Sequence, residues 1–172
     1  NLKDKIKSNF SNQDLRFHCC SSPGIFRIDN TQYDLARIGI AMYGYVDLPD
    51  NVVKPNLKPV LSLWAKKVSE RLVAKGESIG YGQAFKAKQD MNVSTYDIGY
   101  GNGFFRLDEN KQFKISDGRN ILGRVSMNNL AVEGIDEDIC IFNDVQELAK
   151  IHKTISYEIL CRIDSGIKRK II

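Results

Sequence analysis

The stretch from Val60 to Val73, VLSLWAKKVSERLV, alternates apolar and polar residues over much of its length. A period of two is typical of a β-strand with one buried face, so we expect one long strand here. The turn residues Lys75-Gly76-Glu77 follow directly, and glycine is favoured where a chain reverses. This stretch therefore predicts the start of a β-rich region.

Short strand candidates separated by turn residues continue downstream. Many short strands at regular spacing predict a β-sandwich or partial barrel. Asp117-Gly118 is a hairpin signal between two of the candidates. Val145–His152 is the one clear helix candidate in this region, with Asp144 as its N-cap. The strand candidates are Met91–Ile98, Phe113–Ser116, Asn120–Val125, Leu130–Glu133 and Ile139–Phe142.

The residues before Val46 follow a different pattern. Asn1–Phe10 has apolar residues at helical spacing, and Leu15–Cys19 alternates as a short strand would. Pro23 stands where a helix would begin, and Leu35–Tyr45 is a second apolar stretch. Helix, strand, helix, strand is the rhythm of a βα unit from a parallel sheet or barrel.

A domain boundary is expected between these two patterns. Val46–Pro59 holds three of the chain's four prolines and little periodicity, as interdomain segments often do. We therefore predict one domain at residues 1–48 and a second, β-rich domain at residues 49–172. Asn1 in place of an initiator Met suggests that an N-terminal portion precedes the first domain.

The composition of the 172-residue chain limits the classes of partner that we expect for it. Its net charge of +4 is spread along the sequence, and only Lys168-Arg169-Lys170 cluster, so no nucleic-acid partner is expected. Two histidines and an adjacent pair of cysteines, Cys19 and Cys20, do not make a metal-ligand set. Without an apolar run of membrane-spanning length or a signal peptide, we expect a cytoplasmic protein with no membrane partner.

Three local features could carry chemistry. Hydroxyls in HCCSSPGIFR (His18–Arg27), at a strand-to-helix turn, suit either a phosphate or a plain helix cap. Arg37 in an apolar stretch needs a carboxylate or a ligand acceptor as its partner. Tyr81 between two glycines is either an acid/base group or a packed loop aromatic. Each feature alone leaves both interpretations open.

The order of the motifs decides between them. The strings RIGIAMYGY, PVLSL, GESIGYG, IGYGNGF, GRVSMN and TISYEIL follow one another from Arg37 to Leu160. Their order and spacing resemble the alanine racemase family. The resemblance implies a homodimer with an N-terminal (β/α)8 barrel that binds pyridoxal 5′-phosphate (PLP) and a C-terminal β domain. The chain would then be the end of that barrel plus the whole β domain. The lysine that carries PLP would lie before Asn1.

The resemblance also implies the residues that hold the cofactor. Ser22 matches a serine that binds the PLP phosphate, although Ser21 stands where the family usually has Asn. Gly39 and Ile40 match backbone contacts to the phosphate, and Tyr157 matches a tyrosine that hydrogen-bonds it. Arg37 matches the arginine that faces the pyridine nitrogen. Because a guanidinium does not readily give up a proton, it leaves that nitrogen largely unprotonated.

The reacting and substrate-binding residues follow in the same way. Tyr81 matches the catalytic tyrosine, which reaches the cofactor of the partner subunit. Met127 matches a residue whose backbone amide meets the substrate carboxylate. Three further residues match positions around the opening of the site: Tyr100, Arg106 and Arg124. Asn102 and Asn128 depart from the family, which commonly has Asp at both positions.

The implied activity is PLP-dependent interconversion of L- and D-alanine for peptidoglycan synthesis, and the isolated chain should be inactive without the lysine. Two alternatives stay open. The two Asp-to-Asn departures are compatible with a racemase of another small amino acid such as serine. An inactive β-rich binding module derived from the family is the other alternative, although Asn1 and the βα unit argue against it.

Overall fold

The computed structural model of the chain describes residues 2–29, 33–107 and 112–171. Its contacts divide the chain into two compact units, Asn1–Val60 and Leu61–Ile172. The change of pattern in the sequence falls just before this division, whereas the domain limits at 48 and 49 remain a prediction.

The first unit contains short elements. They are α1 (Leu2–Asn9), β1 (His18–Cys19), η1 (Gly24–Phe26), β2 (Leu35–Ala36) and η2 (Ile40–Tyr43). β1 and β2 pair in parallel, with His18 opposite Leu35, as a βα unit requires. The helix predicted at Asn1–Phe10 is confirmed over the described residues, and Asn1 lies outside them. The helix expected after Pro23 is only a single 3-10 turn.

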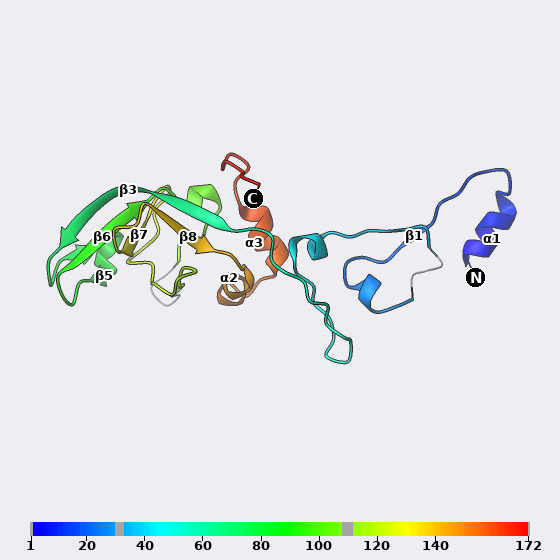
Figure 1. Cartoon of the computed structure of the whole chain (residues 1–172), viewed down its shortest axis with the longest axis horizontal. Coiled ribbons are helices and arrows are strands. Elements are labelled where there is room, and N and C mark those ends of the chain that lie inside the picture. The colour runs from blue at the N-terminus through cyan, green and yellow to red at the C-terminus, as the bar shows by residue number, and fades with distance from the viewer. Residues whose placement is uncertain (1, 30–32, 108–111, 172) are drawn as a thin grey trace. The chain divides into compact units, whose positions relative to one another are not determined.

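The second unit is built on one antiparallel sheet with the strand order β7-β6-β3-β8 (Figure 1). The long strand predicted from the sequence is β3 (Leu63–Val73), and it pairs with both β6 and β8. The mainly β fold class is therefore confirmed. The other elements are β4 (Ser78–Ile79), η3 (Tyr81–Gln83), β5 (Phe85–Lys86), β6 (Met91–Tyr96), η4 (Tyr100–Asn102), β7 (Leu130–Glu133), β8 (Asp138–Phe142), α2 (Gln146–Ile151) and α3 (Ser156–Arg162).

A β-bulge in β3 reverses the faces of the strand. Lys67 pairs with Tyr96 and Ser69 pairs with Thr95, so Val68 is the extra residue. Tyr96 and Thr95 are neighbours on β6 and point to opposite faces, so Lys67 and Ser69 do so as well. The alternation predicted over much of Val60–Val73 is therefore interrupted, because Leu63 and Ala65 are buried before the bulge and only Val73 is buried after it.

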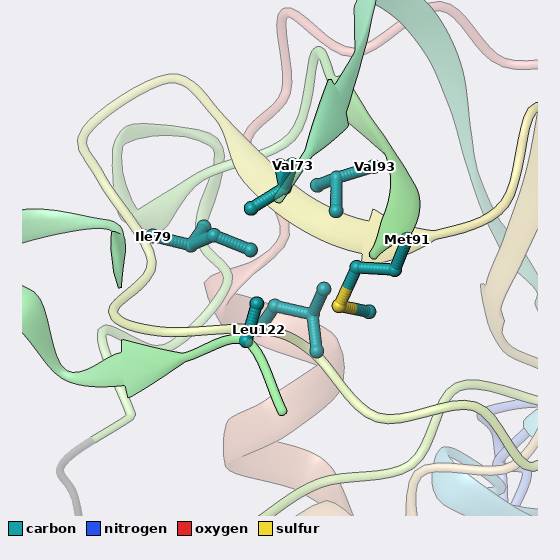
Figure 2. Packing of buried hydrophobic residues seen from close by; sticks show 6 residues of the cluster. Val73, Ile79, Met91, Val93 and Leu122 are labelled. Atoms are coloured by element: carbon teal, nitrogen blue, oxygen red, sulfur yellow. The ribbon is translucent and has the colours of Figure 1, made fainter. Parts of the chain in front are cut away.

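The bulge gives the sheet an apolar cluster on each face. Before it, Leu63 and Ala65 are buried on one face. After it, Val73 joins a second cluster on the opposite face with Met91, Val93, Ile79 and Leu122 (Figure 2). Burial of side chains of this size stabilises a fold by roughly 1.5–3 kcal/mol each. The second cluster fixes the loops around Ile79 and Leu122 to the end of the sheet.

Lys67 lies at the bulge with its side chain only 14% exposed. Its ammonium group contacts Glu70 Oε2 at 2.6 Å and Glu137 Oε1 at 2.7 Å, and it also donates to the Ile135 carbonyl. Hydrogen bonds to the two carboxylates raise the pKa of Lys67 above its usual value. A charged group can therefore occupy this half-buried position because its donors are satisfied.

Three expectations for the second unit need correction. Phe113–Ser116 and Asn120–Val125 are not strands, and they form only the isolated bridges Lys114–Asn120 and Ile121–Val132. The hairpin turn between them is present, with Gly118 at φ +91°. The region also holds a second helix, α3, which includes most of the TISYEIL motif. The predicted helix is confirmed as α2, but its N-cap is Val145 and not Asp144, whose carboxylate accepts the Gln146 N–H from one residue earlier.

Arg119 ties the hairpin at Gly118 to the turn between β7 and β8. Its guanidinium contacts Asp117 at 2.6 Å and Asp136 at 2.7 Å, and donates to the Glu133 carbonyl. Hydrogen bonds from Arg119 hold the pKa of Asp117 below its usual value. The Asp117 carboxylate therefore contributes stability above its unfolded pKa, and this stability is lost as pH falls through the folded pKa.

Replacing Arg119 with methionine is expected to lower the free energy of unfolding at pH 7 by about 1–2 kcal/mol, because two carboxylates lose a shared partner. The difference from the native chain should begin to shrink as pH falls below the ordinary Asp pKa of about 4, and it should be lost as pH falls through the lowered pKa of folded Asp117. Urea unfolding between pH 3 and pH 7 measures both effects. Arg71→Met is the matched control, because Arg71 is exposed and lies 3.9 Å from Glu77. An equal loss in the two variants would refute a special role for Arg119.

Candidate functional site

Ser22 forms the centre of a small polar site in the first unit. Its side chain is buried, and its Oγ accepts the backbone N–H groups of Gly39 at 3.0 Å and Ala41 at 3.3 Å. Both amides lie at the start of η2, where a 3-10 turn leaves N–H groups without partners within the helix. Among the described residues, the Ser22 hydroxyl donates its own proton to no acceptor. The hydroxyl can therefore donate to an anion while it orders the amides.

Arg37 follows β2 and is exposed in this unit. Its Nη1 donates to Nδ1 of His18, which lies at the start of the neighbouring strand β1. Because a guanidinium only donates, Nδ1 of His18 is the acceptor, and a neutral His18 carries its proton on Nε2. The Arg37 N–H also donates to the Cys20 carbonyl at 2.9 Å. Arg37 is thus held at two points, with guanidinium donors left for a ligand.

Tyr81 lies at the tip of a loop in the second unit. Tyr81 is 70% exposed, which excludes a packed loop aromatic within this unit. Gly80 has φ +78° and Gly82 has φ +70°, and both conformations are rare for other residues. A Cβ on Gly80 would also lie 3.0 Å from the Arg124 backbone nitrogen. The two glycines let the loop turn tightly against Gly123-Arg124 and leave the Tyr81 phenol outside the core.

Tyr81 lines a cavity of about 430 Å³. The cavity lies on the face of the sheet that carries the second apolar cluster. Ser69, Arg71 and Thr95 line it from the strands, and Arg124 lines it from the opposite loop. Arg124 is half-buried and passes close to Gly82, whose added Cβ would lie 3.4 Å from Nη1. The cavity therefore offers cationic and hydroxyl groups next to the Tyr81 phenol.

Met127 and Tyr100 lie in two loops that are joined by backbone hydrogen bonds. The Tyr100 N–H donates to the Ser126 carbonyl at 3.0 Å, and the Gly101 N–H donates to the Met127 carbonyl at 2.7 Å. A Cβ on Gly99 would lie 2.4 Å from the same two carbonyl oxygens, so only glycine fits there. Within the described part of the chain, the Met127 N–H has no acceptor. Met127 is 55% exposed, so this amide can meet a ligand.

The remaining predicted residues occupy the same unit. Arg106 is exposed, and its carbonyl accepts the Val125 N–H at 3.3 Å, which places its segment beside that of Arg124. Tyr157 is the second residue of α3 and is 42% exposed. Asn102 closes the η4 turn, because its Oδ1 accepts the Gly99 N–H at 2.9 Å. A carboxylate could accept the same hydrogen bond.

The structure thus brings the predicted residues together in local groups. Ser22 lies with Gly39 and Ile40, whereas Tyr81 lines one cavity with Arg124. Sequence reasoning missed His18 as the partner of Arg37, although its position in the strand before a parallel strand was a signal. It also missed Ser69 and Arg71, because nothing in the sequence reveals the bulge that turns them towards Tyr81.

Within residues 2–29, 33–107 and 112–171, no group of three or more His, Cys, Asp or Glu side chains could hold a metal ion. In the same ranges no helix is both long and apolar enough to cross a membrane.

Comparisons with known proteins give one consistent result. Residues 60–171 match the family model described as the C-terminal domain of alanine racemase. The alanine racemase of Nitratiruptor sp. is 46% identical over 153 residues, covering 89% of this chain and 44% of that protein. The alanine racemase of Campylobacter curvus is 40% identical over 156 residues, covering 91% of this chain and 45% of that protein. The chain therefore spans less than half the length of these relatives.

The solved structures that match this chain are also alanine racemases. An alanine racemase from Clostridium difficile 630 superposes with a TM-score of 0.79 and 27% identity, covering 95% of this chain and 47% of that one. The alanine racemase from Bartonella henselae with covalently bound pyridoxal phosphate has a TM-score of 0.73 and 25% identity, covering 100% of this chain and 52% of that one.

Proposed function

This chain belongs to the alanine racemase family, and from that premise we propose that it supplies the C-terminal part of a PLP-dependent enzyme that interconverts L- and D-alanine for peptidoglycan synthesis. The observation that carries the proposal is Tyr81, an exposed phenol held between two left-handed glycines beside a cationic cavity. A core aromatic would need neither the exposure nor the glycines. A proton-transfer group must reach a substrate, and here the glycines allow the turn that leaves the phenol exposed.

The residues of the first unit fit the proposed cofactor. The buried Ser22 hydroxyl has a proton to donate and orders the amide of Gly39, so Ser22, Gly39 and Ile40 suit a phosphate group. Arg37 keeps free guanidinium donors beyond its bond to His18, and these would face the pyridine nitrogen. We assign Tyr157 to the phosphate as well, as a hydroxyl donor from α3.

When bound, PLP would withdraw electrons from the substrate and so acidify the hydrogen on its Cα. Racemisation then needs one group to remove that proton from one face and another to deliver a proton to the opposite face. We assign Tyr81 to one face. The lysine that carries PLP would act on the other, and it would lie outside this chain.

The substrate carboxylate would be held by donors from the second unit. We assign the Met127 amide to it, because this N–H lacks an acceptor among the described residues and Met127 as a residue is 55% exposed. Arg124 and Arg106 would attract the carboxylate towards the site, since a guanidinium favours anions at short range. Tyr100, 43% exposed beside Met127, would limit the space for the substrate side chain.

The assembly follows from the same assignments. In the proposed cytoplasmic enzyme, two copies associate as a homodimer, and Tyr81 of each copy serves the PLP of the other. A residue that serves a partner's site must stand clear of its own core, as Tyr81 does.

A chimera tests the proposed function. Residues 1–172 would replace the matching segment of the Nitratiruptor alanine racemase, so that the relative provides the lysine and the rest of the barrel. We expect the chimera to bind PLP, to interconvert L- and D-alanine, and to restore growth of a D-alanine auxotroph. The intact relative is the positive control, and the relative cut at the same junction is the negative control.

The substrate profile of the chimera decides between the alternatives. Turnover of L-serine well above that of L-alanine would replace alanine by serine as the substrate. A folded, dimeric chimera that binds PLP but racemises neither amino acid would overturn the proposal and favour an inactive binding module.

A further inference from the structure

We propose that Phe105 is a positioning residue that clamps α3, which carries Tyr157, to the loops that carry Tyr100 and Met127. The proposal rests on the function proposed above, because it concerns how groups of that site are fixed relative to each other. Phe105 itself would contact neither substrate nor cofactor.

The clamp begins with a stack of three side chains. The Phe105 ring stacks on His152, with 3.6 Å between the ring centroids and 19° between the planes. The Arg162 guanidinium lies over the same Phe105 ring, 4.5 Å from its centroid. His152 is the C-cap of α2 and Arg162 is the last residue of α3, so a single ring joins the ends of both helices.

Backbone contacts reinforce the stack. The Asp164 N–H, just after α3, donates to the Asn102 carbonyl at 3.1 Å. Gly103 has φ +88°, and a Cβ there would lie 1.9 Å from the Arg162 carbonyl oxygen. The end of α3 therefore packs directly on the η4 turn, with no room for a side chain between them.

The same turn continues the connection to Met127. Tyr100 and Gly101 donate their N–H groups to the Ser126 and Met127 carbonyls. Contacts thus run without a gap from α3 through Phe105 and η4 to the loop that carries the proposed carboxylate amide. Tyr157 and Met127 lie at the two ends of this series.

The neighbouring phenylalanine anchors the series to the core. Phe104 is 1% exposed and meets Phe113 edge to face, with 5.9 Å between the ring centroids. Adjacent residues thus have different tasks, since Phe104 holds the loop to the β core and Phe105 holds the helices to the loop. Loss of the Phe105 ring should free the helices without unfolding the sheet.

The first experiment needs no cofactor. In the full 172-residue chain, amide hydrogen exchange would be compared for the native sequence, Phe105→Leu and Phe105→Trp. We expect Phe105→Leu to raise the exchange rates at Asp164 and Gly101 about fivefold or more, the change that corresponds to a lost aromatic stack. Phe105→Trp should restore native protection. Phe85→Leu is the matched control, because Phe85 is also half-buried but packs on the second cluster.

The second experiment uses the PLP-bound chimera. Phe105→Leu should raise the KM for alanine and the dissociation constant of PLP about fivefold each, while kcat falls by less. Phe85→Leu should leave the dissociation constant of PLP unchanged even if it lowers the melting temperature equally, because Phe85 packs on the second cluster. His152→Leu, which removes the stack from the other side, should reproduce the Phe105→Leu result.

The outcomes separate this proposal from the proposed function. A chimera without racemase activity or PLP binding would overturn the proposed function, and the clamp would then be decided by hydrogen exchange alone. Unchanged exchange at Asp164 and Gly101 in Phe105→Leu would overturn the clamp. Faster exchange with unchanged KM and PLP affinity in an active chimera would leave a structural contact and overturn the positioning role.

Discussion

Replacing Tyr81 with phenylalanine in the chimera is expected to lower racemisation in both directions by roughly two to four orders of magnitude. Only a hydroxyl is lost from a side chain that is 70% exposed, so the fold and PLP binding should be kept. The rates from L-alanine and from D-alanine should both fall, because proton removal on one face and proton delivery on the other belong to the same reaction. Initial rates from L- and D-alanine, with PLP absorbance as a check on binding, measure the effect.

Isotope exchange sharpens the test of Tyr81. The family resemblance implies that the lysine serves D-alanine and the tyrosine serves L-alanine. In the variant we therefore expect the lysine still to exchange the Cα hydrogen of D-alanine, whereas exchange from L-alanine should nearly vanish. Deuterium incorporation from heavy water into each enantiomer separates the two faces. Tyr33→Phe, a tyrosine outside the candidate site, controls for the loss of a hydroxyl. Equal residual exchange from both enantiomers would disprove the two-base assignment, and undiminished turnover would make Tyr81 an ordinary loop aromatic.

The sequence predicted the elements whose signal is local. The alternation in Val60–Val73 identified the long strand, which the structure limits to Leu63–Val73, and Asp117-Gly118 identified a turn that needs a positive φ at glycine. It did not predict the bulge at Val68, because a bulge depends on the register against β6. Ser156–Arg162 has a short apolar pattern that does not distinguish helix from strand, so α3 was missed.

Predictions for the candidate site divide in the same way. The two flanking glycines singled out Tyr81 in the sequence itself, whereas Ser22 was chosen among its neighbouring hydroxyls only through the resemblance to the family. The pairing of Arg37 with His18 and the stack of Phe105 on His152 depend on tertiary contacts between distant segments. The position of His18 in one strand and Arg37 after the next was a weak signal for the first contact, whereas the stack of Phe105 on His152 has no signal in one sequence.

The second large effect is expected at Gly103, where two constraints on one glycine can be separated. Gly103→Ala should lower the free energy of unfolding of the chain by about 3 kcal/mol or more, because the methyl group would overlap the Arg162 carbonyl oxygen. The positive φ adds a smaller strain, on the order of 1 kcal/mol. Urea unfolding of the 172-residue chain measures the sum.

Gly118→Ala isolates the conformational part of that sum. Gly118 has φ +91°, close to the +88° of Gly103, but nothing lies within 4 Å of its added Cβ. Gly118→Ala should therefore lose only about 1 kcal/mol. The difference between the variants measures how tightly α3 packs on the η4 turn. If both variants lose the same free energy of unfolding, α3 can move away from the η4 turn at a small cost in free energy. A rigid connection between Tyr157 and Met127 would then be ruled out.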